Sequence, residues 1–142
     1  MTIHQLSIFI ENRSGTLIKV LDALKEAKIQ IIASTIADTA EYGIYRLICS
    51  EPLRAQEELK KAGVAVALSE VFAIEIDDQP GRAAEAVKVF SEAGISITYM
   101  YSFLLRGKGI LVFRTDNTEL ARKAIAEYNL RYISEEDLAS WS

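Results

Sequence analysis

The sequence contains little of the chemistry that metal sites and most nucleophilic catalysts need. Among its 142 residues, Cys49 is the only cysteine and His4 the only histidine. One cysteine excludes an intramolecular disulfide and every zinc or iron–sulfur site that needs several thiolates. One histidine has no second histidine with which to hold a metal or relay a proton. We therefore expect no metal, no cofactor and no catalytic residues, and we interpret Cys49, which lies in an apolar run, as a small buried side chain.

Positive charge and long hydrophobic runs are also scarce. The 16 Lys and Arg residues are outnumbered by 20 Asp and Glu residues, so the net charge of −4 gives no general attraction for phosphate backbones. No stretch approaches the roughly 20 apolar residues of a membrane span, and the N-terminus lacks a basic region followed by an apolar run. Half of the residues are hydrophobic, which is enough to build a core. These features predict a cytoplasmic globular protein that binds neither nucleic acid nor membrane.

What the sequence does contain is an internal repeat. When Gly15 is placed over Gly81, 66 residues further on, the apolar and glycine positions stay in phase without a gap almost to the end. The matched positions include Leu6, Ile8 and Ile10 with Phe72, Ile74 and Ile76, Ile29 and Ile31 with Ile95 and Ile97, and Gly43 with Gly109. Such self-similarity indicates a duplicated structural unit. The sequence therefore predicts two rigidly apposed domains, residues 1–70 and 71–142, because no flexible linker separates them.

Each half begins with the same strand and helix patterns. Alternating apolar residues predict a first strand, and an apolar stripe with i, i+3, i+4, i+7 spacing predicts a helix packed on a sheet. Runs rich in β-branched and aromatic residues then predict second strands at 29–36 and 95–103. The helical stripes are Leu17, Val20, Leu21 and Leu24 in the first half and Ala83, Ala86, Val87 and Phe90 in the second.

Turn glycines and capping residues predict a third strand, a second helix and a short fourth strand in each half. The turns are marked by Gly43 and by 107–109, and the third strands lie at 44–49 and 110–115. The second helices begin at caps in 50–52 and 116–118 and end at Gly63 and Asn129. The fourth strands lie at 64–68 and 130–133. The resulting order is βαββαβ, twice.

This order predicts an α+β protein made of two tandem ferredoxin-like units. A βαββαβ unit closes as an antiparallel four-stranded sheet with both helices on one face. A single unit of this size leaves one sheet face bare and two strand edges exposed, which are liabilities for a soluble protein. We therefore expect the two units to pair side by side, and the chain to form a homo-oligomer such as a dimer.

The candidate site is a polar loop that occurs at the same place in both halves. Asn12-Arg13-Ser14-Gly15 and Asp78-Gln79-Pro80-Gly81 each lie between the first strand and the first helix. Backbone N–H groups at a helix start favour a carboxylate, and Asn12 or Asp78 can accept hydrogen bonds from an ammonium group. Together these groups suit an α-amino acid. The same residue types also form plain turns and helix caps, so the loops remain open to a purely structural interpretation.

An Asn/Asp-x-x-Gly loop after the first strand of a βαββαβ unit resembles the ACT domain, an amino-acid-sensing module attached to many biosynthetic enzymes. The whole chain resembles a stand-alone pair of ACT-type domains. The resemblance implies a regulatory protein whose small-molecule effector, an amino acid, binds at the interface between paired domains, and a metabolic enzyme as the partner. The implied ligand-binding residues are Asn12, Arg13, Ser14, Gly15 and Thr16, Asp78, Gln79, Pro80, Gly81 and Arg82, and the second-strand residues Ile31 and Ile97. No catalytic domain is attached, and the two loops differ, so one site could be degenerate.

Three other functions compete with this interpretation. Acylphosphatases share the topology, but their glycine-rich phosphate loop is absent here, and no asparagine occurs between positions 13 and 116. Tyr99, Tyr101 and Phe103 alternate on one predicted strand and could stack RNA bases, but the net charge opposes this function. A protein–protein interaction module without a ligand is the main alternative.

Overall fold

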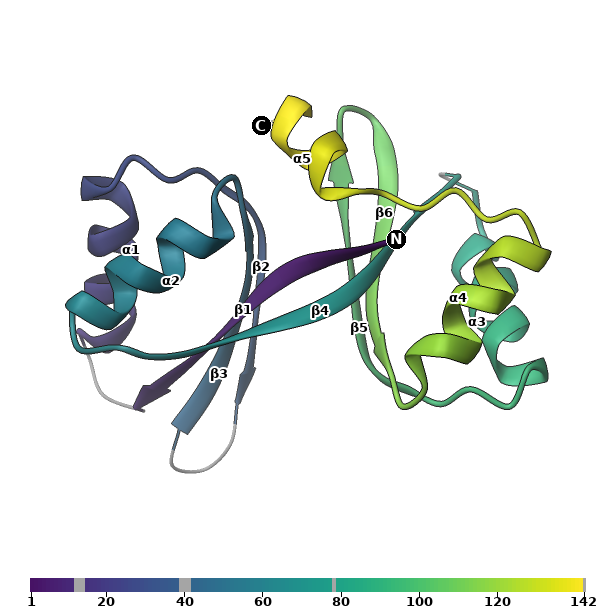
Figure 1. Ribbon diagram of the computed structural model, residues 1–142, viewed down its shortest axis with the longest axis horizontal. Helices are drawn as coiled ribbons and strands as arrows, with labels where there is room; N and C mark the ends of the chain where they lie inside the picture. Colours follow the sequence, from purple (N-terminus) through teal and green to yellow (C-terminus); the bar gives the residue numbers. More distant parts are fainter. Residues whose placement is uncertain (12–14, 39–41, 78, 142) are drawn as a thin grey trace. The chain divides into compact units, whose positions relative to one another are not determined.

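The computed structural model describes residues 1–11, 15–38, 42–77 and 79–141 (Figure 1). As far as residue 127, strands and helices follow the order predicted from the repeat, except that the strand predicted at 64–68 and the first strand of the second half form one strand. One additional helix lies at the end of the chain. The elements are β1 (Thr2–Glu11), α1 (Thr16–Glu26), β2 (Ile31–Asp38), β3 (Tyr42–Cys49), α2 (Pro52–Lys61), β4 (Ala65–Ile76), α3 (Arg82–Glu92), β5 (Ile97–Leu105), β6 (Lys108–Thr115), α4 (Thr118–Glu127) and α5 (Glu135–Trp141).

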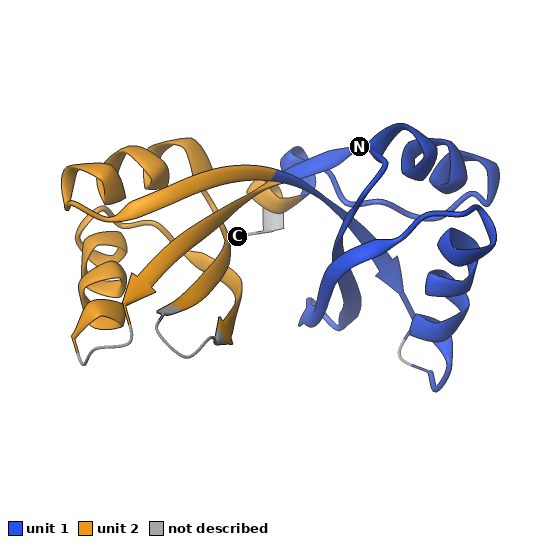
Figure 2. Cartoon of the chain, turned by 90° about the horizontal axis from the view of Figure 1, so that it is seen from below, with its two compact units in different colours: residues 1–3, 70–137, 141 blue, residues 4–69, 138–140, 142 orange. Residues whose placement is uncertain are grey.

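The chain divides into two compact units (Figure 2). The N-terminal unit, orange in Figure 2, is built mainly from residues 4–69, and the C-terminal unit, blue, mainly from residues 70–137. Strand order is β2-β3-β1-β4 in the first and β4-β6-β5 in the second. The β1–β3, β2–β3, β4–β6 and β5–β6 pairs are antiparallel. In each unit both helices cover the same sheet face, which confirms the predicted α+β class with two ferredoxin-like units.

Each unit has its own hydrophobic core between sheet and helices. The N-terminal core is largely aliphatic, with Leu6, Leu47 and Leu59 fully buried. The C-terminal core contains three phenylalanines: the Phe113 ring centroid lies 4.8 Å from that of Phe90 and 5.5 Å from that of Phe72.

The apolar stripe predicted for α1 is confirmed, but the one predicted for α3 is partly wrong. Leu17, Val20, Leu21 and Leu24 all pack in or against the N-terminal core. In α3, Ala86 and Phe90 are buried as predicted, whereas Ala83 is exposed and Val89 contacts the core. Burial of the single methyl group of Ala83 would contribute little free energy, so it does not determine which face of the first turn is buried.

Helices α1 to α4 share one C-terminal motif. Lys28, Gly63, Gly94 and Asn129 take left-handed φ values of 58°, 79°, 77° and 52°, which confirms the predicted role of Gly63 and Asn129. The residue after each donates its N–H to the carbonyl five residues earlier: Ile29 to Leu24, Val64 to Leu59, Ile95 to Phe90 and Leu130 to Ile125, at 2.9–3.0 Å. This is the Schellman motif with its hydrophobic residue.

The Schellman motifs correct the predicted starts of the second strands. Ile29 and Ile95 are buried because they close helix ends, and β2 and β5 begin two residues later, at Ile31 and Ile97. An apolar residue at this position extends the β-like pattern backwards, which is why the prediction began too early.

Two glycines predicted to mark turns instead lie within strands. Gly43 pairs with Ile10 and Asp38, and Gly109 pairs with Ile76 and Leu104. The β5–β6 turn is formed by Arg106 and Gly107, whose φ values of 52° and 77° suit a two-residue hairpin of type I′. A Cβ on Gly109 would lie only 3.0 Å from the Ile76 carbonyl oxygen, so this glycine allows close strand approach.

The fourth strands also differ from the prediction. In the N-terminal unit the fourth strand continues without a break into the first strand of the next unit, forming the 12-residue β4. At the C-terminus, residues 130–133 make only one bridge, Tyr132 with Ile74, and two flanking backbone hydrogen bonds of 2.8 Å. Because β1 is already the neighbour of β4 opposite β6, only the end of that edge is left for this segment.

Residues 50–52 and 116–118 were predicted to cap the second helices, and only part of this is right. Asn117 caps α4 by accepting a hydrogen bond from the Leu120 N–H at 3.1 Å. Pro52 opens α2, which has no side-chain cap. Ser50 and Asp116 instead accept hydrogen bonds from the backbone N–H of Gln30 and Ser96, and so hold the segment before the second strand. Among the described residues, no helix has the length and hydropathy to cross a membrane.

Candidate functional site

The two loop glycines of the predicted site lie at helix starts. Gly15 and Gly81 are the N-cap residues of α1 and α3, with φ values of 95° and 88°. A Cβ at either position would meet nothing within 4 Å, so the backbone conformation, and not lack of space, demands glycine. Among the described residues, no side chain caps either helix, unlike α4 with Asn117. The Arg82 N–H donates to the Gln79 carbonyl oxygen at 3.3 Å. Backbone N–H groups at a helix start lack intrahelical partners, and the remaining ones of these first turns can serve a ligand. Asn12, Arg13, Ser14 and Asp78 lie outside the described residues.

The first residues of α1 and α3 differ in chemistry. In α1 the Thr16 hydroxyl donates a hydrogen bond of 2.8 Å to the Glu11 carbonyl oxygen and closes its own loop. In α3 the Arg82 guanidinium lies between two carboxylates: its Nε is 3.4 Å from Asp77 Oδ2 and its Nη1 is 3.0 Å from Glu85 Oε2. Its Nη2 also donates to Gln79 Oε1 at 3.4 Å. The structure thus brings Gln79, Gly81 and Arg82 together, and Pro80 is exposed in the same turn.

The two second-strand residues implied by the resemblance are placed differently. Ile31 and Ile97 begin β2 and β5, and both pack against the hydrophobic core of their own unit. Neither residue lines either of the two cavities described below, and a role in ligand binding stays a prediction for both.

A cavity of about 450 Å³ adjoins Arg82 in the C-terminal unit. It lies where the end of β4 and the start of α3 meet the end of α4. Its lining combines aliphatic side chains with charges of both signs and one tyrosine: Ile74, Glu75, Ile76, Asp77, Arg82, Glu85, Ala86, Val89, Tyr128 and Leu130. Concave, partly apolar sites with a few convergent polar groups are typical of small-molecule binding.

Most of this lining was not predicted from the sequence. Only Arg82 belongs to the predicted set of ligand-binding residues. Glu85 could have been found, because it lies one helical turn after Arg82 with opposite charge. From the sequence, Glu75 is only a charge within an apolar strand. Tyr128 and Leu130 lie more than 45 residues after Arg82 in the sequence. No local pattern links them to the loop.

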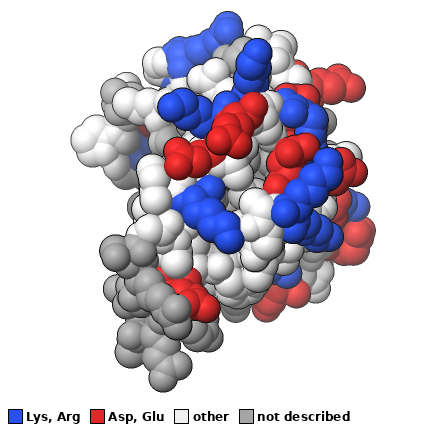
Figure 3. Space-filling model, turned by 90° about the vertical axis from the view of Figure 1, so that its left-hand side faces the viewer, with Lys and Arg blue, Asp and Glu red and all other residues white. Residues whose placement is uncertain are grey.

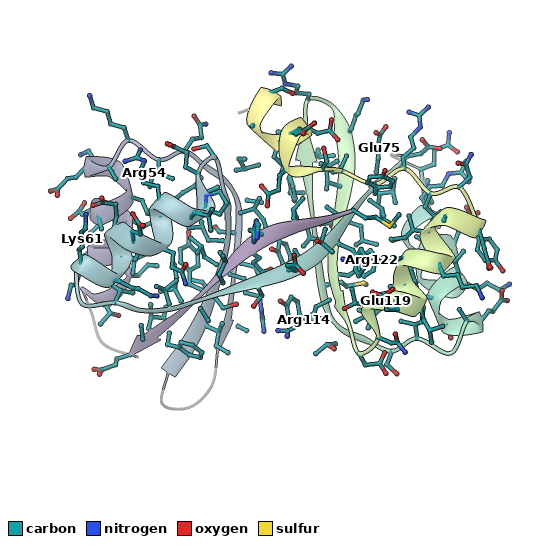
Figure 4. The ribbon with its side chains drawn as sticks, in the orientation of Figure 1. Arg54, Lys61, Glu75, Arg114, Glu119 and Arg122 are labelled. Carbon is teal, nitrogen blue, oxygen red and sulfur yellow. The ribbon has the colours of Figure 1, made fainter. Side chains whose placement is uncertain are left out.

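Glu75 is the most buried charge of the cavity wall. Its side chain is 19% exposed, and its Oε1 lies 3.6 Å from both Lys108 Nζ and Arg131 Nη1. Figure 4 shows Glu75 in the C-terminal unit, far from the Glu119–Arg122 pair of α4. Glu75 is therefore charge-compensated from outside the cavity, whereas Asp77 and Glu85 share the single guanidinium of Arg82.

A second polar cavity, also of about 450 Å³, lies in the N-terminal unit between the end of α1 and α2. Arg54 of α2 donates a 2.5 Å hydrogen bond to the Ala27 carbonyl oxygen and so caps α1. It also pairs with Glu51 at 2.9 Å, and this hydrogen bond holds the pKa of the Glu51 carboxyl below its ordinary value of 4.5. Arg54 thus has a structural role in this cavity, whose other charged side chains are Glu26, Glu58 and Lys61 (Figure 4).

Charge on the outer face of the N-terminal unit is mixed. Lys and Arg side chains alternate with Asp and Glu over the described part of the face in Figure 3, and Lys61 pairs with Glu58 at 3.5 Å. Such a face gives no extended basic track of the kind that binds nucleic acid backbones. Within the described ranges, no group of three or more His, Cys, Asp or Glu side chains is arranged to hold a metal ion.

Comparisons with known proteins agree with the fold and the duplication. The profile of the "ACT domain pair" family matches residues 1–141. A solved structure from Bacteroides thetaiotaomicron is 34% identical, with a TM-score of 0.92, covering 98% of this chain and 96% of its own. No curated protein sequence matches significantly.

More distant structures share the fold alone. The regulatory subunit of aspartate kinase from Thermus thermophilus is 18% identical with a TM-score of 0.59, covering 87% of this chain and 91% of its own. The corresponding subunit from Thermus flavus is 16% identical with a TM-score of 0.57, covering 87% and 90%.

Proposed function

Because the chain belongs to the ACT domain family, as a pair of such domains, we propose that it is a non-catalytic regulatory protein that binds an amino acid. The observation that carries the proposal is the cavity beside Arg82. It offers the Arg82 guanidinium for the α-carboxylate, the neighbouring Asp77 carboxylate for the α-ammonium group, and an aliphatic wall for a side chain.

The regulated partner is proposed to be a separate metabolic enzyme in the cytoplasm. The two Thermus proteins of the same fold are regulatory subunits of aspartate kinase, which shows that this fold can serve an enzyme as a subunit. For this chain we propose the same mode of action, as a homo-oligomer, without naming the enzyme. Domain limits of 1–70 and 71–142 and a ligand position at a domain interface stay predictions from the sequence and the family resemblance.

Calorimetry and thermal melts with each of the twenty amino acids test this function. A ligand that binds the folded state at 100 times its Kd stabilises it by about 2.7 kcal/mol, which raises the melting temperature by several degrees. The matched variants are Arg82→Ala and Thr16→Ala, which occupy equivalent positions of the repeat. We expect Arg82→Ala to weaken binding. A loss of binding in Thr16→Ala as well would add the loop of the N-terminal unit to the site. If none of the twenty gives heat or a shifted melt, the chain is an interaction module without a ligand.

A further inference from the structure

We propose that the cavity of the C-terminal unit selects a basic amino acid, with a second amine at the end of an aliphatic side chain. This inference rests on the proposed function and specifies the ligand of the same cavity. The first argument is the division of the lining between aliphatic and charged surfaces. Ile74, Ile76, Val89 and Leu130 provide hydrocarbon along which a chain of methylene groups can lie.

The second argument is a charge balance among the groups that line the cavity. Arg82 is shared by Asp77 and Glu85, whose side chains are 73% and 68% exposed and therefore free to adjust. When a ligand α-carboxylate takes the guanidinium, both carboxylates lose their partner. An α-ammonium group compensates only one of them. A second ammonium group on the same ligand compensates the other, whereas a dicarboxylic amino acid adds repulsion.

The third argument is the pair of helix ends that meet at the cavity. Its lining includes Arg82 and Glu85 at the start of α3, where the helix dipole favours negative charge, and Tyr128 at the end of α4, where it favours positive charge. Tyr128 is 53% exposed, so its ring is accessible to an ammonium group. A ligand that carries both a carboxylate and a side-chain amine complements these groups.

The fourth argument is that the duplicate lacks the same groups. At the positions equivalent to Glu75, Glu85 and Tyr128, the N-terminal half carries Phe9, Lys19 and Ala62. A cation replaces a carboxylate, and a methyl group replaces the aromatic ring. The proposed selectivity therefore belongs to the C-terminal unit, with one such site per chain.

Calorimetry of the full chain with three probes tests the inference. L-Lysine and L-norleucine share the same four-carbon aliphatic stem, but only lysine carries the terminal amine, and L-glutamate carries a carboxylate instead. We expect lysine to bind about tenfold more tightly than norleucine, because one charge-assisted hydrogen bond of its terminal ammonium group contributes about that factor in affinity. We expect glutamate to bind more weakly than either.

Variants locate the effect. Glu85→Gln should weaken lysine binding about tenfold and change norleucine binding less than twofold, because only lysine uses the second carboxylate. Glu85→Asp, which keeps the charge, should retain most of the lysine preference. Lys19→Gln is the matched change in the other unit and should alter neither ligand. Thermal melts of the unliganded variants control for folding, since Glu85 is an exposed side chain.

Failure of the inference and failure of the proposed function give different results. Equal binding of lysine and norleucine, or an unchanged lysine affinity in Glu85→Gln, overturns the charge selection while amino acid binding stands. If only Lys19→Gln loses lysine binding, the site lies in the N-terminal unit, and this outcome also overturns the inference. If none of the twenty amino acids binds, both proposals fail together.

Discussion

The two units are copies of one backbone plan with different side-chain chemistry. Matched pairs of residues preserve backbone features. Gly15 and Gly81 begin α1 and α3, and Gly63 and Asn129 end α2 and α4. The side chains around them have diverged, since the N-terminal core is largely aliphatic and the C-terminal core contains three phenylalanines. The difference teaches that duplication retained what determines the fold, while the groups around the α3 cavity were free to specialise.

The largest expected effect concerns the two cores. Phe90 and Leu24 are matched in the repeat, and both are at most 1% exposed. Phe90→Ala should lower the free energy of unfolding by about 4 kcal/mol and Leu24→Ala by about 3 kcal/mol, because each leaves a cavity in proportion to the volume removed. Urea unfolding of both variants measures this. A loss below about 1 kcal/mol for Phe90→Ala would contradict close packing of Phe90 against Phe113 in this core.

The matched strand glycines should respond unequally to an added methyl group. In Gly109→Ala the new Cβ would lie 3.0 Å from the Ile76 carbonyl oxygen, whereas in Gly43→Ala the nearest atoms lie at 3.4 Å. We expect losses of about 2 kcal/mol for the first and under about 1 kcal/mol for the second. Equal losses in denaturant titrations would show that the close approach of β6 to β4 is not specific to that unit.

The first helix of each unit ends in a left-handed residue, lysine in one and glycine in the other. Lys28 has a φ of 58° and Gly94 a φ of 77°. Gly94→Lys should cost about 1 kcal/mol, because a side chain is disfavoured in this conformation. Lys28→Gly should gain roughly 0.5 kcal/mol, since the added flexibility of the unfolded chain offsets part of the relief. Thermal melts of the two variants should therefore move in opposite directions.

The smallest effect is a pH dependence in the N-terminal unit, at a pair of residues that the repeat does not copy. Arg54 lowers the pKa of Glu51 below 4.5, so the pair stabilises the fold above that pH, and its contribution is lost as the pH falls through the lowered value. The matched positions in the C-terminal unit are Asn117 and Leu120, which do not titrate. In Arg54→Gln, an NMR titration should find the pKa of Glu51 back near 4.5. An unchanged pKa would show that the Arg54 hydrogen bond is not its cause.

The repeat predicted much of the fold because its signals are local. Left-handed residues, apolar alternation and helical stripes report on the backbone within a few residues of themselves. The errors came where one local pattern serves two structures. Ile29 was predicted as a strand residue but belongs to the Schellman motif at the end of α1. Gly43 was predicted as a turn residue but lies in a strand.

The candidate site was predicted less completely than the fold. The loop glycines and Arg82 were found because they adjoin one another in the sequence. Tyr128 and Leu130 were missed, because only the packing of α4 beside α3 brings them to the cavity.

By itself, the sequence determined the duplication, the order of strands and helices in each half up to its second helix, and the resemblance to the ACT family. These depend on local conformation and on the period of apolar residues. Only the tertiary structure decided that β4 joins two units without a break, that residues 130–133 form a bridge instead of a strand, and that Glu75, Arg82 and Tyr128 share one cavity. Such features depend on which edges and helix ends remain available after distant segments have packed, and no local pattern encodes that.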